Sequence, residues 1–164
     1  MSQVPPPFSQ VPPPSGVPWP PILLAGCFLA ALLWDWWVLP LPVPFAEVDI
    51  VHGLGWLLLA TAGGLLIWSA LAFWRHKTTI RPDRPASALI ESGPYAWSRN
   101  PIYLADATAL MGLGLALNRL SLVVMTAVFV ALVARLAIRP EEQHLERRFP
   151  QAFAAYRTRV RRWL

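Results

Sequence analysis

Two short polar blocks of the chain contain the residues best suited to chemistry. The first block is Glu91–Tyr103 and the second is Arg139–Glu146. Each block adjoins a long apolar segment, and the distribution of Lys and Arg predicts that both lie at the cytoplasmic face of a membrane. Polar groups gathered at one membrane face indicate a site for a polar cofactor and a lipophilic substrate. A simple membrane anchor needs no such gathering.

The first block contains a strong helix start. Asn100 is a favoured N-cap residue, and Pro101 suits the first helical position because its missing N–H would have no partner there. The helix that begins at Pro101 therefore presents backbone N–H groups and the positive end of its dipole, which suits an anion such as a carboxylate. The alternative is that Asn100 alone satisfies those donors.

The second block is predicted to start another helix. Arg139 and Pro140 would begin it, so that Glu141 and Glu142 fall in its first turn, where acidic residues complement the helix dipole. Two adjacent carboxylates at a membrane surface also repel each other and anionic lipids. They gain if they face a cationic or polyhydroxylated ligand, and an α-ammonium group or a ribose diol would both qualify.

Other polar residues in these regions have simpler explanations. Asp106 shares a helix face with Tyr103 and lies about 7 Å inside the helix start, so it is either functional or paired, with Arg135 as the expected partner. Glu141 and His144 have the spacing of a carboxylate-bridged metal motif. The chain has only 3 His, and a zinc or di-iron site needs more ligands, so no metal is expected.

Composition indicates a membrane protein. The chain has 164 residues, 55% of them hydrophobic, and a mean hydropathy of +0.44. This apolar content is too high for a soluble domain of this size and favours several membrane spans. The net charge is +5, but Lys and Arg are absent before residue 75, so nucleic acid is not expected as a partner.

Four apolar segments, each near the roughly 20 residues needed to cross a bilayer, predict an all-α integral membrane fold. They cover residues 22–39, 53–74, 101–117 and 120–138, and the last two are joined by a tight turn at 118–119. Residues 1–21 contain a tandem Pro-rich repeat and are expected to form a disordered tail. Residues 22–164 are then the membrane domain, with Asp35 hydrated at the face opposite the two polar blocks.

The C-terminal stretch is expected to form an interfacial helix. Basic residues are concentrated in 75–100 and 139–164, which places both regions in the cytoplasm. Beyond residue 138, apolar residues recur at helical spacing with arginines between them, and Pro150 should divide the stretch into two short helices. Its arginines would face lipid phosphates, and the segment would also cover the site. The apolar residues are Leu145, Phe149, Phe153, Tyr156, Val160 and Trp163.

Several of these segments together resemble the isoprenylcysteine carboxyl methyltransferase family and the related phospholipid N-methyltransferases. The motifs are residues 74–82, 89–95, 98–104, 139–142 and 156–163. The resemblance covers residues 70 to 164 and implies an all-α membrane enzyme that uses S-adenosylmethionine without the Rossmann-like sheet of soluble methyltransferases. The usual Arg-His-Pro-x-Tyr of the family begins here at Arg99 with Asn100 in place of His, so no step through an imidazole is expected at this position.

The resemblance also implies roles for individual residues. Arg99 would orient an anionic nucleophile, and Tyr95 or Tyr103 would offer an aromatic face to adenine or to the sulfonium. The expected catalytic residues are Arg99, Asn100 and Tyr103. The expected cofactor-binding residues are Gly93, Pro94, Tyr95, Pro101, Glu141 and Glu142.

The predicted function is methyl transfer from S-adenosylmethionine to a lipophilic carboxylate, thiol or amine by a multi-pass membrane protein whose site faces the cytoplasm. The acceptor would be a lipophilic small molecule, a lipidated substrate or a membrane lipid. Two alternatives stay open at this point. One is a nicotinamide-dependent membrane reductase of similar helical architecture. The other is a non-catalytic membrane protein that uses its Pro-rich tail for interaction.

Overall fold

The structure is a computed structural model that describes residues 19–44, 48–75 and 89–164, and every regular element in these ranges is helical. This confirms the predicted all-α fold class. The expected Pro-rich tail lies outside the described residues except for its last three positions. The elements are α1 (Trp19–Trp37), α2 (Val48–Arg75), the short helix η1 (Gly93–Ala96), α3 (Pro101–Ala116), α4 (Leu120–Val133), the π-helical turn η2 (Ala134–Ile138), α5 (Arg139–Arg148) and α6 (Pro150–Arg159).

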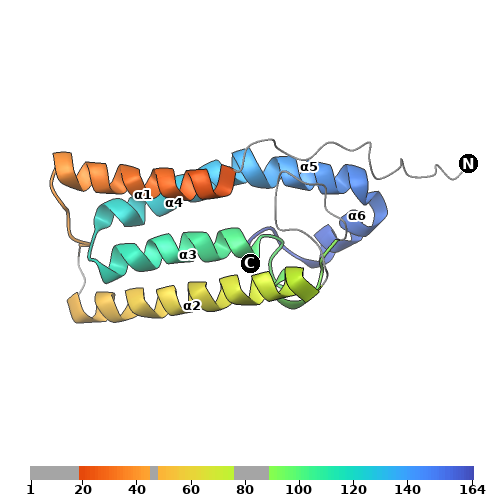
Figure 1. The fold of residues 1–164 in the computed structure, drawn as a ribbon, viewed down its shortest axis with the longest axis horizontal. Helices are drawn as coiled ribbons and strands as arrows, with labels where there is room; N and C mark the ends of the chain where they lie inside the picture. Colours follow the sequence, from red (N-terminus) through yellow and green to blue (C-terminus); the bar gives the residue numbers. More distant parts are fainter. Residues whose placement is uncertain (1–18, 45–47, 76–88) are drawn as a thin grey trace, which may run out of the picture.

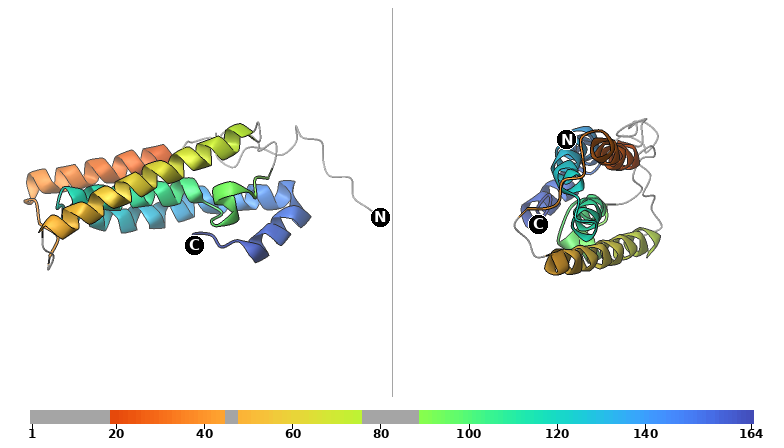
Figure 2. Two further views of the ribbon diagram at one scale, coloured as in Figure 1. Left: turned by 90° about the horizontal axis from the view of Figure 1, so that it is seen from below. Right: turned by 90° about the vertical axis from the view of Figure 1, so that its left-hand side faces the viewer.

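The long helices form an elongated bundle in which α3 lies between α2 and the pair formed by α1 and α4 (Figures 1 and 2). Helix α1 begins three residues before the predicted boundary at residue 22, because Pro20 and Pro21 fall in its first turn, where no intrahelical N–H bond is required. The main core lies between α1, α3 and α4 and includes the fully buried Phe129 and Val133.

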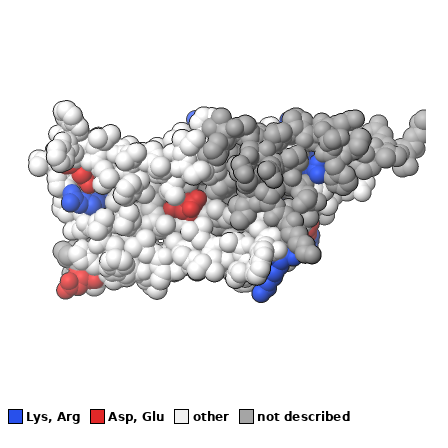
Figure 3. Space-filling view, viewed as in Figure 1, with Lys and Arg blue, Asp and Glu red and all other residues white. Residues whose placement is uncertain are grey.

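Three helices in the described part of the chain are long and apolar enough to cross a membrane. They are α1 with 19 residues, α2 with 28, and the continuous helix Leu120–Arg148 with 29. Helix α3 is apolar but has only 16 residues. Three of the four predicted spans therefore have the length of a span, and the third segment forms a shorter apolar helix packed among them. In one view of the surface, charged side chains appear mainly toward the two ends, with one acidic patch between them (Figure 3).

Glycines allow α2 and α3 to approach closely. A Cβ added to Gly55 would lie 2.2 Å from the backbone nitrogen of Ala116, and one added to Gly112 would lie 3.0 Å from the Gly55 carbonyl oxygen. The close approach occurs at Gly55 and Gly112, whereas a Cβ at Gly53 would meet nothing within 4 Å. Only a residue without a side chain fits at Gly55, because the neighbouring backbone fills the space that a Cβ would need.

The turn between α3 and α4 is the tight hairpin that the sequence predicts. Asn118 has φ 51, a left-handed conformation that Asn tolerates, and its Oδ1 accepts a hydrogen bond from the Val43 N–H at 2.9 Å. Asp35, expected to be hydrated, instead lies 3.5 Å from Arg119 through Oδ2. Its other oxygen is buried and has no hydrogen-bond partner among the described residues. We call this part of the molecule the hairpin end.

The second polar block does not begin a separate helix as predicted. The residues before Pro140 are already helical, and the Arg139 N–H donates to the Ala134 carbonyl across a π-helical turn. A proline inside an α-helix lacks an N–H and clashes with the carbonyl four residues earlier, and a wider π turn is one way to accommodate it. Glu141 and Glu142 consequently lie on a direct extension of the apolar helix α4.

Candidate functional site

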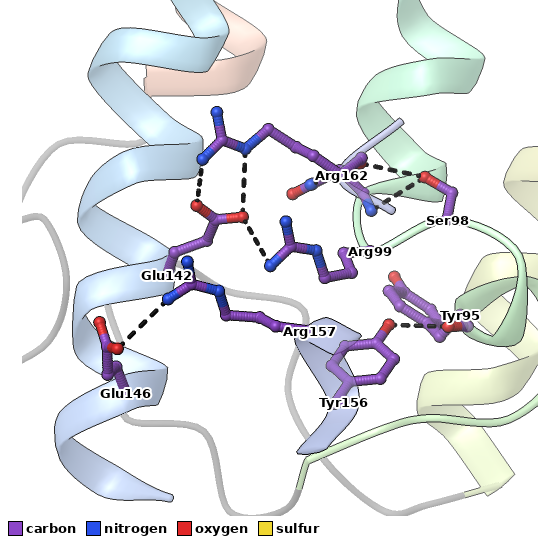
Figure 4. A network of polar contacts seen from close by, with 9 residues as sticks. Tyr95, Ser98, Arg99, Glu142, Glu146, Tyr156, Arg157 and Arg162 are labelled. Carbon is purple, nitrogen blue, oxygen red and sulfur yellow. Dashed lines mark hydrogen bonds and ion pairs between the residues drawn. The ribbon is translucent and has the colours of Figure 1, made fainter. Parts of the chain in front are cut away.

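The two polar blocks meet at the end of the bundle opposite the hairpin, which we call the site end. The start of α3, the short helix η1, the first turns of α5 and the last residues of the chain come together there (Figures 1 and 4). Residues more than sixty positions apart, such as Asn100 and Arg162, are hydrogen-bonded to each other. The sequence predicts both blocks at the cytoplasmic face of a membrane; the structure brings them together at one end of the bundle, and the cytoplasmic side stays a prediction.

Tyr103 and Glu141 are directly bonded. The Tyr103 hydroxyl donates to Glu141 Oε1 at 2.6 Å, a short bond of the kind expected when the acceptor is charged. Tyr103 lies in the first turn of α3 and Glu141 in the first turn of α5. The bond therefore joins the two polar blocks and holds one carboxylate oxygen at the site end.

Glu142 lies between two arginines. Arg162 bonds to it through two nitrogens, with Nη2–Oε2 at 2.6 Å and Nε–Oε1 at 3.2 Å, and Arg99 Nη1 lies 3.2 Å from Oε1 on the other side (Figure 4). The side chains of Arg99 and Glu142 are only 11% and 14% exposed. Burial lowers the pKa of Arg99 and the nearby Glu142 opposes that shift, but a guanidinium stays charged in proteins.

Arg99 retains N–H groups that the described residues do not use. Its Nε and Nη1 are buried and make no well-aligned hydrogen bond to the described part of the chain, although Nη1 is in ion-pair contact with Glu142. A buried N–H without a partner is costly, and a ligand, an ion or a water bonded to it would remove that cost. The arrangement is therefore suited to binding an anion that has two oxygens, such as a carboxylate or a phosphate.

Asn100 does not cap α3 with its side chain as one alternative required. It precedes Pro101 at the expected position, but its side chain makes no capping bond. Its Nδ2 instead donates to the Arg162 carbonyl at 2.9 Å, and its own N–H donates to Ser98 Oγ at 3.1 Å. Asn100 therefore holds the C-terminal segment in place, and the first turn of α3 keeps its backbone donors.

The cofactor-binding segment predicted around Gly93 forms the short helix η1. Gly93 has φ +63, which favours glycine, and an added Cβ would lie 3.4 Å from Trp68 Nε1 on α2. Pro94 and Tyr95 are buried, and the Tyr95 ring packs edge-on against Phe73 at 5.5 Å between ring centroids. The Tyr95 carbonyl accepts a hydrogen bond from the Tyr156 hydroxyl at 2.7 Å, which ties η1 to α6.

The structure differs from two other expectations. Arg135 is exposed and makes no ion pair with Asp106, so the predicted pairing of these two residues is wrong. The apolar residues of the C-terminal stretch do not form an open face, because Phe153, Tyr156 and Val160 are buried together within the protein. Pro150 does divide the stretch into α5 and α6, as predicted.

The described residues contain no group of three or more His, Cys, Asp or Glu side chains arranged to hold a metal ion. His144, which shares the spacing of a metal motif with Glu141, is buried on α5.

Sequence reasoning did not assign a role to Arg162 or Ser98. Both residues fall inside the segments that carry the family resemblance, but their contacts join positions far apart in the chain. The Ser98 hydroxyl lies 3.4 Å from the Arg162 carbonyl, and the Arg162 side chain reaches back to α5. The only signal in the sequence was an arginine-rich C-terminus near a pair of glutamates, which is also typical of a membrane-surface helix.

Comparison with known proteins identifies relatives over most of the chain. A family model described as phospholipid methyltransferase matches residues 50–152, so the predicted relationship to this group of enzymes is confirmed. The cobalt-zinc-cadmium resistance protein CzcN of Cupriavidus metallidurans is 31% identical over 139 residues, which are 84% of this chain and 56% of that protein. The nickel-cobalt-cadmium resistance protein NccN of Alcaligenes xylosoxydans xylosoxydans is 32% identical over 93 residues, or 57% of this chain and 39% of that protein.

The chain thus spans about half the length of the curated relatives that it matches. No solved structure matches the chain.

Proposed function

The chain belongs to the phospholipid methyltransferase family, and we propose that it transfers a methyl group from S-adenosylmethionine to a lipophilic acceptor at the cytoplasmic face of a membrane. The acceptor nucleophile is a carboxylate, a thiol or an amine. The family match and the apolar helices support a membrane methyltransferase in general. The cofactor, the class of acceptor and the orientation in the membrane are the parts that we propose.

One observation carries the proposal: the same end of the apolar helices holds a nearly buried guanidinium with N–H groups that make no hydrogen bond to the described residues, and a carboxylate bonded to a tyrosine. Arg99 supplies the guanidinium, and Glu141, bonded to Tyr103, supplies the carboxylate. A carboxylate suits the α-ammonium group or the ribose diol of S-adenosylmethionine, and a guanidinium suits an anionic group of the acceptor. The side chains present fit these groups, and no metal ligand is required for the reaction.

S-adenosylmethionine supplies a methyl group on a sulfonium, which transfers to a nucleophile without acid–base work when the nucleophile is already an anion. Glu141 is the proposed ligand of the ammonium group or the ribose diol. Glu142 was predicted as a second cofactor ligand, but both of its oxygens contact arginines, so its proposed task is to hold Arg99. Gly93, Pro94, Tyr95 and Pro101 form the backbone next to the cofactor.

The proposed catalytic residues act by positioning. Arg99 holds an anionic group of the acceptor with its fork of N–H groups, and Tyr103 fixes Glu141 through its hydroxyl. Asn100 has no titratable group and cannot remove a proton at neutral pH. Orientation and exclusion of water then account for most of the rate, as expected for a displacement between two bound groups.

Activity is tested directly with the full chain in detergent or nanodiscs. Purified protein is incubated with methyl-labelled S-adenosylmethionine and a total membrane lipid extract, and label is counted in the lipid fraction. We expect labelled lipid from the wild-type chain and much less from Glu141→Gln when S-adenosylmethionine is below saturation. A chain that is stabilised against thermal unfolding by a nicotinamide cofactor, but not by S-adenosylmethionine, would favour the membrane reductase instead.

Orientation is tested by labelling single cysteines in a Cys27→Ala background. Pro42 lies in the connection between α1 and α2, and Gln151 lies in α6. The basic residues near the site end predict that a cysteine at Gln151 is cytoplasmic and one at Pro42 is on the opposite side. Labelling of both cysteines from the same side would contradict the proposed cytoplasmic site.

The names of the two relatives suggest a biological setting for the reaction. Both are named for resistance to metal ions, and we propose that methyl transfer by this chain contributes to such tolerance. A strain without the chain should grow less well in cobalt, zinc or cadmium, and the wild-type chain should restore growth while Glu141→Gln should not. If the wild-type chain and Glu141→Gln both restore growth, metal tolerance does not depend on methyl transfer.

A further inference from the structure

The last residues of the chain return to the candidate site and are anchored on both sides of it. After α6 the backbone becomes extended at Val160, whose side chain is buried beside Phe153 and Tyr156. Trp163 packs against the main core cluster, which includes Phe129. We call residues 160–164 the C-terminal strap. Because its two hydrophobic anchors lie in different clusters, the residues between them have little freedom to move.

Main-chain bonds align the C-terminal strap with the residues proposed for catalysis. The Arg99 N–H donates to the Arg161 carbonyl at 3.0 Å. The Arg162 carbonyl accepts from Asn100 Nδ2 at 2.9 Å and lies 3.4 Å from the Ser98 hydroxyl. The Arg99 backbone and the side chains of its two neighbours are thereby bonded to the strap.

The Arg162 side chain is also connected to Arg99 indirectly, through Glu142. Its fork holds both oxygens of Glu142, and Glu142 Oε1 in turn contacts Arg99. A carboxylate held by a two-point contact with a planar guanidinium has a fixed orientation as well as a compensated charge. Arg99 is thus held by the C-terminal strap twice, through the Arg161 carbonyl and through the Arg162 side chain by way of Glu142 (Figure 4).

We infer that Arg162 is a positioning residue for the proposed methyl transfer, acting through Glu142 to orient the guanidinium of Arg99. This inference rests on the proposed function. It makes the C-terminal strap a part of the site, and it gives Glu142 a role distinct from that of Glu141. Glu142 contacts Arg99 through Nη1, and this contact sets the direction in which the buried Nε–H points.

The inference is tested with Arg162→Lys and Arg162→Ala in the full chain. The assay follows transfer of label from methyl-labelled S-adenosylmethionine to a membrane lipid extract, and calorimetry measures the affinity for S-adenosylmethionine. Lys keeps the charge but loses the two-point contact, so we expect kcat to fall about tenfold in Arg162→Lys and up to a hundredfold in Arg162→Ala, the range typical of a misplaced reacting group. Affinity for S-adenosylmethionine should change less than about twofold, since Glu141 does not contact Arg162.

Arg157→Ala is the matched control. Arg157 also lies near the C-terminus and pairs with a glutamate of α5, but that partner, Glu146, is 59% exposed. Arg157→Ala removes the same positive charge as Arg162→Ala, and its kcat should stay at the wild-type value. If kcat falls equally in Arg157→Ala, the rate depends on positive charge near the C-terminus rather than on the position of Arg99. That result would overturn the inference.

A double variant separates positioning from simple stabilisation. If Arg162 acts through Glu142, then Arg162→Lys combined with Glu142→Gln should be no slower than Glu142→Gln alone, because the two changes break one connection. If the double variant is slower than Glu142→Gln by the same factor that Arg162→Lys is slower than the wild type, the inference is overturned. Should Arg162→Ala not fold, Arg162→Lys and the double variant still decide the question.

The outcomes also distinguish the two proposals. A wild-type chain that transfers no label to the lipid extract overturns the proposed function, and this inference with it. A wild-type chain that labels lipid while Arg162→Lys turns over at the same rate overturns only the role of Arg162.

Discussion

Charged residues form a pair at the hairpin end of the bundle and a connected group of three at the site end. At the hairpin end, Asp35 and Arg119 form a single pair at 3.5 Å, and the Arg119 side chain is 39% exposed. At the site end, Arg99, Glu142 and Arg162 form a connected group with contacts of 2.6 to 3.2 Å, in which the Arg99 side chain is 11% exposed and the Arg162 side chain 38% exposed. A single long pair with a well-exposed arginine contributes little to stability, whereas a carboxylate held by a two-point contact with a guanidinium has a fixed orientation.

The two ends also differ in how their helices are held together. The hairpin end relies on close backbone packing between Gly55 and the α3 residues Gly112 and Ala116, and on a turn bonded to the connection between α1 and α2. The site end relies on hydrogen bonds between distant segments and leaves N–H groups of Arg99 unused. The hairpin end is thus joined mainly by packing and the site end mainly by polar contacts, which is why the site end is the proposed binding region.

The largest expected effect is at the hairpin end, from Gly55→Ala. The added Cβ would lie 2.2 Å from backbone of α3, and backbone cannot move aside as a side chain can, so we expect a loss of about 3 kcal/mol in the free energy of unfolding. Denaturant unfolding in detergent measures it. Gly53→Ala is the control, because its Cβ would meet nothing and Ala favours a helix. Equal stability of the two variants would contradict the close packing of α2 on α3.

A large effect on binding, with little change in stability, is expected at the site end from Glu141→Gln. The substitution keeps the shape and an acceptor for the Tyr103 hydroxyl but removes the charge. A hydrogen bond to a charged group contributes about 1.5–3 kcal/mol, so the dissociation constant for S-adenosylmethionine should rise roughly tenfold to a hundredfold. Glu146→Gln on the same helix is the exposed control. Unchanged affinity in Glu141→Gln would remove this residue from the cofactor site.

Arg99→Lys should reduce turnover while leaving cofactor affinity nearly intact. Lys keeps the positive charge near Glu142 but lacks the planar fork that suits an anionic group, so we expect kcat to fall about tenfold, which corresponds to about 1.4 kcal/mol. Steady-state labelling of lipid and calorimetry with S-adenosylmethionine measure the two quantities separately. If affinity is abolished and the turnover of bound cofactor is unchanged, Arg99 binds the cofactor and not the acceptor.

The smallest effect is expected from Asp35→Asn at the hairpin end. The lost pair with Arg119 is long and its arginine is well exposed, so the free energy of unfolding should change by less than about 1 kcal/mol. Methyl transfer should stay at the wild-type rate, because the site end is at the far end of the helices (Figure 1). A strong loss of activity in Asp35→Asn would show that the two ends are coupled and would weaken the comparison.

Much of the fold was predictable because it depends on local sequence. Runs of apolar residues gave four helices close to their observed positions, and Pro101 and Pro150 each begin a helix as expected. The turn at Asn118 was predictable from the short polar break between two apolar segments. Helix formation uses bonds between residues four positions apart, so patterns of nearby residues determine it.

The candidate site was only partly predictable. The residues of the two polar blocks do meet, and the Glu pair lies beside Tyr103 and Arg99. The predicted partner of Asp106 was wrong, since Arg135 is exposed. Which way a residue faces depends on the rotation of its helix against its neighbours, and the π turn before Pro140 changes that rotation within the helix itself.

By itself, the sequence determined that this is an apolar helical protein with polar groups at one end, and its motifs indicated the methyltransferase family. Only the tertiary structure decided that Asn100 bonds to Arg162 rather than to its own helix, and that Glu142 is held by two arginines while Glu141 bonds to a tyrosine. The physical reason is that these contacts join residues far apart along the chain. These contacts join segments separated by twenty to sixty residues, so they form only where packing of the long helices brings the segments together.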